Sequence, residues 1–411
     1  MAERHLPKVD VASSNLVSRS KRAERRMDPV TVTSHVGRML SDMRRSVPPF
    51  LLIVAIALGA CSGAPAATEP MASSRASEPP APPSRTPSGE PTPSEAATAS
   101  PTPIPEPEPL AWTRLEADGP TAREDHTWTV DGAGEVAYLF GGRDGATVFD
   151  DTWAFDLRND TWTQLAPSTA PPGRFGHEAV WVDEIGLVLF AGQAGPSFFN
   201  DLWAYDPSAD AWTQLPAEGA LPTPRYGSCA GLGPDGRFWI SHGFTQDGTR
   251  FSDTRAYDFS TGAWTDETPE GSRPVERCLH GCWWTDAGEL ALYAGQTTGV
   301  TALDDRWVLR DGAWERVEGV LPPARNLYAR ARADGGTIVF GGQAIDGGFQ
   351  SDLWLLRDDE ADALALDPDN EPPPGRAGAE LIMDKQGGRA ILFGGRNTDG
   401  RLDDTWALAG L

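Results

Sequence analysis

The sequence has few lysines, few cysteines and no apolar run long enough to cross a membrane as a helix. Its most apolar stretch, residues 50–60, has eleven residues, whereas a helix that spans a bilayer core of about 30 Å needs about twenty. We therefore expect a secretion signal there and no transmembrane anchor. Beyond residue 60 the only lysine is Lys385, and all other cations are arginine. We attribute this preference to the base composition of the genome and not first to function.

Positive charge is also scarce in the part of the chain that follows. The whole chain has a formal net charge of −24 at pH 7, and residues 1–60 hold ten Lys/Arg against five Asp/Glu, so the remainder carries −29. Nothing basic enough to bind a phosphate backbone is left. An acidic surface is also repelled by anionic headgroups. We therefore expect no nucleic-acid partner, and membrane contact only through a lipid anchor.

The amino-terminal sixty residues fall into two segments. Residues 1–42 are polar and basic without apolar periodicity, which predicts a disordered or untranslated extension. Residues 43–60 place Arg44 and Arg45 before the apolar run, and LGAC at 58–61 resembles the lipobox of bacterial lipoproteins. The resemblance implies a lipoprotein signal peptide and lipidation of Cys61; the alternative is an ordinary signal with a chance cysteine. We expect an exported protein, lipid-anchored at the bacterial cell envelope, with its folded part on the extracytoplasmic side.

Residues 61–109 form a spacer that begins at the lipidated cysteine. They are almost all Pro, Ser, Thr, Ala and Glu, a composition that predicts a disordered, solvated linker. At the polyproline rise the segment would reach roughly 150 Å. We expect it to act as a stalk.

One pattern recurs six times between residues 110 and 411. Residues 173–215 show it in full, with two apolar runs, a glycine-rich turn, Asp201-Leu202-Trp203 and AWTQL at 211–215. This reads as four short strands separated by turns, and a four-stranded unit repeating at roughly fifty residues predicts a propeller blade. The glycine pairs or their remnants are Gly141-Gly142, Ala191-Gly192, His242-Gly243, Ala294-Gly295, Gly341-Gly342 and Gly394-Gly395. The Asp-x-Trp triplets begin at Asp151, Asp201, Asp253, Asp305, Asp352 and Asp404, and the third has Arg255 in place of Trp.

A glycine pair, an Asp-x-Trp triplet and a final Trp together resemble kelch repeats, which form β-propellers. The resemblance covers residues 110–411, with one departure at Arg255 and another in the fifth repeat, where residues 363–367 lack the final Trp. The sixth repeat ends without a fourth strand, while AWTRL at 111–115 matches AWTQL. We therefore predict an all-β fold, a six-bladed kelch-type propeller that the N-terminal strand closes. We expect a monomer.

An arginine opens each repeat, and its aspartate follows 27 or 28 residues later. This constant spacing predicts that the two side chains meet and brace the loops of each blade. The alternative is a ring of arginines at the channel mouth that binds an acidic ligand, as kelch adaptor proteins do with acidic peptides. The arginines are Arg123, Arg174, Arg225, Arg277, Arg325 and Arg376.

The loops that follow the glycine pairs vary in length and sequence. Loops on a rigid scaffold usually carry binding, so we predict a binding surface from the first residue of each loop together with Phe198, which is out of register with its neighbours. The residues are Arg143, Gln193, Phe198, Phe244, Gln296, Gln343 and Arg396.

Histidines and cysteines offer further candidates. His126, His177 and His280 hold equivalent positions and could converge on the channel as a metal or acid–base site; the alternative, which we favour, is packing, and we predict no metal. After Cys61 the repeat register places Cys229 beside Cys282 or Cys278. A disulfide with one spare thiol is possible in an exported protein, and three free thiols are the alternative.

These features predict a surface-tethered module that binds an envelope protein or a glycan, without catalysis or cofactor. The alternative is a sugar-active enzyme that resembles galactose oxidase or a sialic acid epimerase. Galactose oxidase requires a copper held by two tyrosines and two histidines, and here only Tyr226 and Tyr328 lie outside the strand registers. No motif marks them as ligands, and fold analogy alone confers no chemistry.

Overall fold

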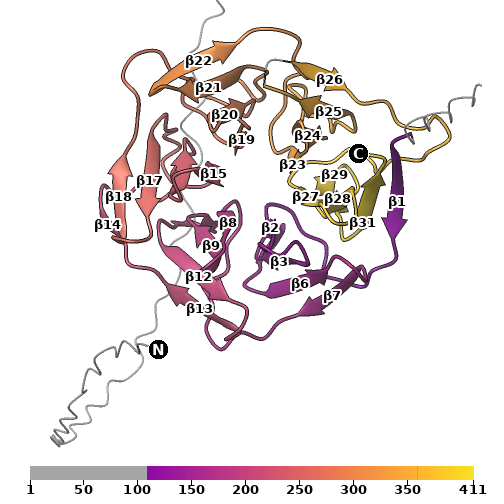
Figure 1. Cartoon of the computed structure of the whole chain (residues 1–411), viewed down its shortest axis with the longest axis horizontal. Helices are drawn as coiled ribbons and strands as arrows, with labels where there is room; N and C mark the ends of the chain where they lie inside the picture. The colour runs from indigo at the N-terminus through magenta and orange to yellow at the C-terminus, as the bar shows by residue number, and fades with distance from the viewer. Residues whose placement is uncertain (1–108, 359) are drawn as a thin grey trace, which may run out of the picture. The chain divides into compact units, whose positions relative to one another are not determined.

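The computed structural model describes residues 109–358 and 360–411. These residues form strands and turns only, and none of them belongs to a helix that could cross a membrane. The expected extension, signal peptide and linker, with Cys61, lie outside the described residues. Six antiparallel sheets surround a central axis, as predicted, and Figure 1 shows them as the blades of a ring.

The first three blades run from the innermost to the outermost strand in chain order. Blade I contains β2 (Thr127–Val130), β3 (Val136–Phe140), β6 (Thr152–Asp156) and β7 (Thr161–Gln164). Blade II contains β8 (Glu178–Val182), β9 (Gly186–Phe190), β12 (Leu202–Asp206) and β13 (Ala211–Gln214). Blade III contains β15 (Cys229–Leu232), β16 (Phe238–Ser241), β17 (Thr254–Asp258) and β18 (Ala263–Asp266), with the short β14 (Glu218–Gly219) parallel to β18.

The last three blades follow the same order. Blade IV contains β19 (Gly281–Trp284), β20 (Leu290–Tyr293), β21 (Arg306–Arg310) and β22 (Ala313–Val317). Blade V contains β23 (Ala329–Ala333), β24 (Gly336–Phe340), β25 (Leu353–Leu356) and β26 (Ala361–Ala363). Blade VI contains β27 (Glu380–Asp384), β28 (Arg389–Phe393) and β31 (Thr405–Ala409), and its outermost strand is β1 (Ala111–Leu115).

The N-terminal strand closes the ring, as predicted. β1 pairs with β31 in antiparallel register from Ala111 opposite Ala409 to Leu115 opposite Thr405. Trp112 is buried and its ring centroid lies 5.2 Å from that of Phe340 in blade V. The two ends of the domain are therefore joined by a complete sheet, which leaves no open edge between the first and the last repeat.

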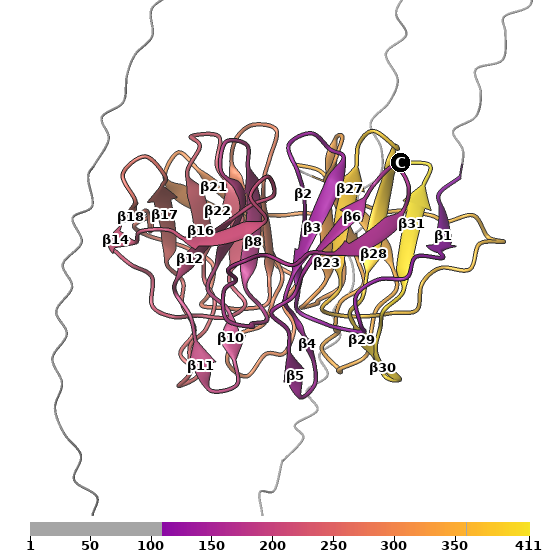
Figure 2. The ribbon, with the colours of Figure 1, turned by 90° about the horizontal axis from the view of Figure 1, so that it is seen from below.

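Short hairpins project from one side of the ring, and Figure 2 shows them along one edge. They are β4 (Arg143–Asp144) with β5 (Thr147–Val148), β10 (Gln193–Ala194) with β11 (Ser197–Phe198), and β29 (Arg396–Asn397) with β30 (Gly400–Arg401). Each of them joins the second and third strands of its blade. We call this side of the propeller, where the loops after the glycine pairs lie, the loop face.

Tryptophans of the outermost strands fill the space between neighbouring blades. The indole of Trp212 in blade II packs 5.0 Å from the ring of Phe140 in blade I and donates to the Thr152 hydroxyl at 3.1 Å. Trp264 in blade III packs in the same way, 4.9 Å from Phe190 in blade II. Large buried aromatic side chains that contact two blades stabilise the propeller, because each removes a large apolar area from water.

Blade V lacks this tryptophan, and the structure shows what replaces it. Ala361 pairs with Leu356, the position at which Trp162 pairs with Phe155 in blade I. In blade IV, Arg306 stands where blade I has a threonine; it is fully buried and its guanidinium donates to the backbone carbonyl of Arg357. A long side chain from blade IV thus reaches toward the end of β25 and supplies bulk that blade V does not.

Candidate functional site

Each blade contains the Arg–Asp pair that the spacing predicts. The two terminal nitrogens of the arginine donate to the two carboxylate oxygens at 2.6–3.0 Å, and the same arginine also donates to two backbone carbonyls. The pairs are Arg123–Asp151, Arg174–Asp201, Arg225–Asp253, Arg277–Asp305, Arg325–Asp352 and Arg376–Asp404. All six arginines are buried, which favours the structural role over the alternative of a ligand-binding ring at the channel mouth.

The triplet tryptophan has its role in the same brace. In five blades its indole N–H donates to the aspartate two residues earlier at 2.6–2.7 Å. Blade III has Arg255 in place of the tryptophan, and its Nε donates to Asp253 at 3.1 Å, so the hydrogen bond to the aspartate is kept. Burial alone would raise the pKa of these carboxyls, but the hydrogen bonds and charge of the paired arginine lower the pKa of Asp201, Asp253, Asp305, Asp352 and Asp404.

A ring of backbone hydrogen bonds surrounds the channel beside the loop face. One residue from each blade donates its N–H to the carbonyl of the equivalent residue in the preceding blade, at 2.8–3.1 Å, until the ring closes. All six have φ between 51° and 67°, a conformation that costs little for glycine but is strained for the three other residues. The ring residues are Asp125, Gly176, Gly227, Leu279, Leu327 and Gly378.

Three arginines of the loop face converge on one buried carboxylate. Glu124 is fully buried and contacts Arg396 Nε at 2.5 Å, Arg401 Nη2 at 2.7 Å and Arg143 Nε at 3.3 Å. Arg143 also pairs with Asp125 at 2.9 Å. The side chains of Arg143, Arg396 and Arg401 are 28%, 23% and 37% exposed, so their outer edges remain open to solvent. We call these three arginines with Glu124 the arginine cluster.

Aromatic side chains extend from the arginine cluster across blades II and III. The guanidinium of Arg143 lies 4.2 Å above the ring of Phe175, whose centroid is 5.5 Å from that of Tyr226. Phe244 then packs edge-on against Tyr226 at 5.1 Å and against Phe198 at 5.8 Å. Cations above rings and edge-to-face rings are favourable contacts. They connect the partly exposed rings of Phe198 and Phe244 to Arg143 through the buried rings of Tyr226 and Phe175.

The structure places the seven predicted binding residues around the same end of the channel. Six of them bridge, in antiparallel pairing, to the residue that follows each scaffold arginine. Arg143 and Arg396 belong to the arginine cluster, and Gln343 accepts from Arg396 Nη2 at 3.3 Å. Gln193 instead donates to its own hairpin, at Gly195, and Gln296 to the Cys278 sulfur. The cluster therefore contains two of the seven and contacts a third, and Phe198 and Phe244 belong to the row of aromatic rings beside it.

Comparison with known proteins agrees with this geometry. A family model described as the KLHDC2/KLHL20/DRC7 Kelch-repeats domain matches residues 104–295, and the six blades carry the corresponding repeats. The propeller is a kelch-repeat domain.

Curated relatives share parts of this kelch chain. It is 31% identical over 137 residues to tRNA wybutosine-synthesizing protein 4 of Emericella nidulans, and the match covers 30% of this chain and 12% of that protein. It is 26% identical over 312 residues to Adagio-like protein 1 of Oryza sativa subsp. japonica, covering 70% of this chain and 41% of that protein. Acyl-CoA-binding domain-containing protein 5 of Arabidopsis thaliana is 36% identical over 78 residues, or 18% and 12%. The chain thus spans less than half the length of each of these relatives.

The three histidines at equivalent repeat positions pack between blades. His126 lies edge-on to Phe393, His177 bonds through Nε2 to the Thr127 hydroxyl at 2.9 Å, and His280 lies edge-on to His242. Burial, reinforced by the neighbouring arginines, lowers the pKa of all three well below the ordinary value, so they are neutral. Among the residues that the structure describes, no three His, Cys, Asp or Glu side chains are grouped so as to hold a metal ion.

The two tyrosines considered for a copper site take part in the scaffold of the kelch domain. Tyr226 donates from its hydroxyl to Asp125 at 3.1 Å. The Tyr328 hydroxyl donates to the Tyr293 carbonyl and accepts from the Gly281 N–H, both at 2.9 Å. Their hydrogen bonds fix the innermost strands relative to one another.

The channel of the kelch domain contains a cavity of about 60 Å³ lined by acidic groups. Glu178 and Glu380 project into it from β8 and β27, and Arg330 Nη2 lies 3.9 Å from Glu178. Burial raises the pKa of Glu178 to about 8 and that of Glu380 to about 7, against the opposing charge of Arg330. The channel therefore holds protons near neutral pH.

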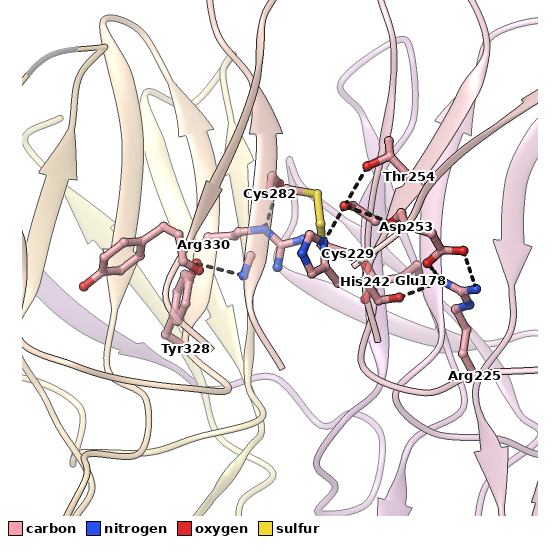
Figure 3. Close-up of a disulfide and its surroundings, with 12 residues drawn as sticks. Glu178, Arg225, Cys229, His242, Asp253, Thr254, Cys282, Tyr328 and Arg330 are labelled. Carbon is pink, nitrogen blue, oxygen red and sulfur yellow. Dashed lines mark hydrogen bonds and ion pairs between the residues drawn. A yellow bond between two sulfur atoms is a disulfide. The ribbon is translucent and has the colours of Figure 1, made fainter. Parts of the chain in front are cut away.

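A disulfide joins the innermost strands of blades III and IV. It links Cys229 with Cys282, which resolves the two pairings left open by the sequence, and Cys278 remains a buried free thiol. Figure 3 shows the bond between the two strands, with Arg330 extending toward it; Arg330 Nε donates to the Cys282 carbonyl at 3.2 Å. The bond covalently links neighbouring blades close to the acidic cavity.

Sequence reasoning missed the residues at the centre of the arginine cluster. Glu124 holds the position at which the other repeats have Phe, Tyr, Cys, Asn and Ala, so it is the one charged residue in that register. That departure was the available signal. Arg401 was also missed; it pairs with Arg396 across its hairpin, the position that Val148 and Phe198 hold in blades I and II, so the available signal was its charge at that position.

Proposed function

We propose that this kelch domain is a binding module without catalysis, whose protein ligand docks on the loop face and presents an acidic group to the arginine cluster. The observation that carries the proposal is the convergence of Arg143, Arg396 and Arg401 on Glu124. Three guanidiniums against the carboxylates of Glu124 and Asp125 leave a local excess of positive charge. On a protein with a net charge of −24, such a spot directs an acidic ligand to one place.

The surroundings of the cluster suit a protein ligand. Buried arginine and aromatic anchors carry most of the binding energy in protein interfaces, and here Phe198 and Phe244 lie beside the arginines on the same face. Glu124 fixes the arginine side chains before the ligand arrives, so less side-chain freedom is lost on binding. The guanidinium forks can then accept a carboxylate in bidentate geometry.

The tether completes the proposal. A lipidated Cys61 and the stalk of residues 61–109 would place the domain outside the membrane, where its ligand is an envelope protein. Secretion of a Cys61→Ala variant into the medium or its release from membranes would support this part. Retention of that variant in the membrane fraction would contradict it, independently of what the loop face binds.

Peptide selection tests the ligand. A random peptide library is selected on the purified protein and, in parallel, on an Arg143→Ala/Arg396→Ala variant. Sequences enriched only on the wild-type protein are expected to carry Asp or Glu. Arg158→Ala/Arg310→Ala, which removes two exposed arginines from the β6–β7 turn and the end of β21 on the opposite side of the propeller (Figure 2), is the matched control and should select the same peptides as wild type. Identical selections on all three proteins would refute the proposed surface.

A further inference from the structure

We infer that Asp125 makes the loop face sensitive to pH, so that its protonation strengthens the hold of the arginine cluster on an acidic ligand. This inference rests on the proposed function and adds a regulator to the same surface. Asp125 occupies the junction between the channel and the loop face, because it is a member of the backbone ring and a partner of Arg143.

The carboxyl of Asp125 is fixed in place and poorly solvated. The residue is 7% exposed, and its backbone is held at φ 58° by the ring. Oδ2 accepts from Arg143 Nη2 at 2.9 Å and from the Tyr226 hydroxyl at 3.1 Å. Oδ1 is buried and has no hydrogen-bond partner among the described residues. A carboxylate with one oxygen unsatisfied loses much of its hydration, which favours the neutral form.

The charges that face Asp125 come from every neighbouring element and do not balance. Glu124 is adjacent in the chain and shares Arg143 with it, and the charge of Glu380 on β27, in the neighbouring blade VI, also opposes its ionisation. Arg396 on β29 opposes them at longer range, and His126 is neutral. Burial and the charge of Glu124 together raise the pKa of Asp125 to about 6. Among the described residues, neutral Asp125 leaves Glu124 as the carboxylate paired with all three arginines.

Protonation and ligand binding are therefore linked. With Asp125 ionised, the group of Glu124, Asp125 and three arginines carries one net positive charge; with Asp125 neutral it carries two. Removing a negative charge a few ångströms from a bound anion is worth about three- to tenfold in affinity at a partly exposed site. The reverse holds as well, since a bound anion must raise the proton affinity of Asp125 by the same factor.

The test uses a probe that does not itself titrate. A rhodamine-labelled hexapeptide of cysteic acid keeps its sulfonates ionised across the range, and its binding to the whole protein is followed by fluorescence anisotropy. We expect the wild-type protein to bind it three- to tenfold more tightly at pH 5.5 than at pH 7.5. Asp125→Asn, which tolerates the left-handed backbone, should bind at both pH values as tightly as wild type at pH 5.5. Equal pH dependence in both proteins overturns the inference.

A measurement without ligand separates this inference from the proposed function. The ¹⁵N–¹H signal of Arg143 Nε, assigned with an Arg143→Lys variant, should shift with a midpoint near pH 6 in wild type and remain constant in Asp125→Asn. If the peptide fails to bind at any pH while this midpoint is present, the proposed acidic ligand is wrong and Asp125 still controls Arg143. A constant signal in wild type from pH 5 to 8 refutes the inference, whatever the peptide does.

Discussion

Asp151 shows at the scale of one residue how the repeat stabilises itself. It accepts two hydrogen bonds from Arg123 and one from the indole of Trp153, while the guanidinium of Arg123 lies 4.2 Å above the ring of Phe149. Breaking such a pair leaves a buried charge without its partner, which costs more than the pair contributes. The Arg–Asp pair recurs in all six blades, so the side chains most often repeated in the sequence are scaffold.

Asp151→Asn should therefore destabilise the protein strongly. We expect a loss of about 3 kcal/mol in the free energy of unfolding, because Arg123 stays buried without a counter-charge. Urea denaturation followed by tryptophan fluorescence measures it. The matched control is Asp150→Asn, the exposed neighbour in the same loop, which should change stability by less than about 0.5 kcal/mol. Equal effects of the two substitutions would contradict the structural role of the brace.

Spacing in the sequence is sufficient to predict this brace, and insufficient to predict the arginine cluster. The interval of 27 or 28 residues between the arginine and the aspartate recurs in all six repeats, which a chance arrangement would not produce. The sequence leaves open only whether the pair is buried. Arg401 meets Glu124 across 277 residues, and only once, because blade VI lies beside blade I in the closed ring. A contact that occurs only once leaves no periodic pattern in the sequence, so the repeats do not predict it.

At the scale of an element, β1 is the strand on which closure depends. Its fold position could be predicted because blade VI lacks a fourth strand and AWTRL matches the missing sequence. The packing of blade V could not be predicted in the same way. Ala361 stands where other blades have a tryptophan, and the compensating bulk of Arg306 comes from another repeat. A sequence pattern within one repeat does not show how its side chains pack against a neighbouring repeat.

Trp112→Ala should weaken the closure. Trp112 is 3% exposed and packs against Phe340, so the substitution creates a cavity between blades V and VI that we expect to cost about 3–5 kcal/mol. Differential scanning calorimetry and size-exclusion chromatography follow the loss and any aggregation through the exposed edge of β31. Thr113→Ala, exposed on the other side of the same strand, serves as control. A shift no larger than that of the control would show that β1 does not close the ring.

The disulfide should stabilise the joint between blades III and IV. Its half-cystines are 53 residues apart, a loop for which cross-linking typically contributes about 2–4 kcal/mol. We expect Cys229→Ala/Cys282→Ala to lose that amount and to become insensitive to reductant in urea unfolding. Cys278→Ala, which removes the free thiol, should keep the sensitivity of wild type. If reductant shifts wild type and the double variant alike, the bond assignment is wrong.

At the scale of the whole domain, the channel couples stability to pH. Glu178 and Glu380 have a pKa raised to about 8 and about 7 by burial, whereas an unfolded chain ionises both well below pH 6. The folded state thus binds more protons, and the stability from these groups is present at low pH and lost as pH rises through 7 and 8. The buried histidines act below pH 7, where the unfolded chain alone takes up their protons and stability rises with pH, so above pH 7 the glutamates set the slope.

Raising the pH from 7 to 8.5 should therefore lower the free energy of unfolding by about 1–2 kcal/mol. Glu178→Gln should remove most of this dependence, because its amide cannot ionise in the channel. Urea unfolding at half-unit steps of pH measures both proteins. Glu184→Gln, an exposed glutamate in the turn between β8 and β9, is the control and should follow wild type. A wild-type curve that rises over this range would reverse the sign that the cavity predicts.

The central claim is that ligands dock on the loop face at the arginine cluster, and a hydrogen-exchange footprint tests it most directly. A peptide obtained by the selection on wild type is added at saturation, and amide exchange is compared with and without it. The account predicts slowed exchange in the hairpins β4–β5 and β29–β30 and in the loop at 343–350, with the opposite turns at 131–135 and 183–186 unchanged. Protection of those turns, with unaltered exchange in the two hairpins, would place the ligand on the other side of the propeller and contradict the account.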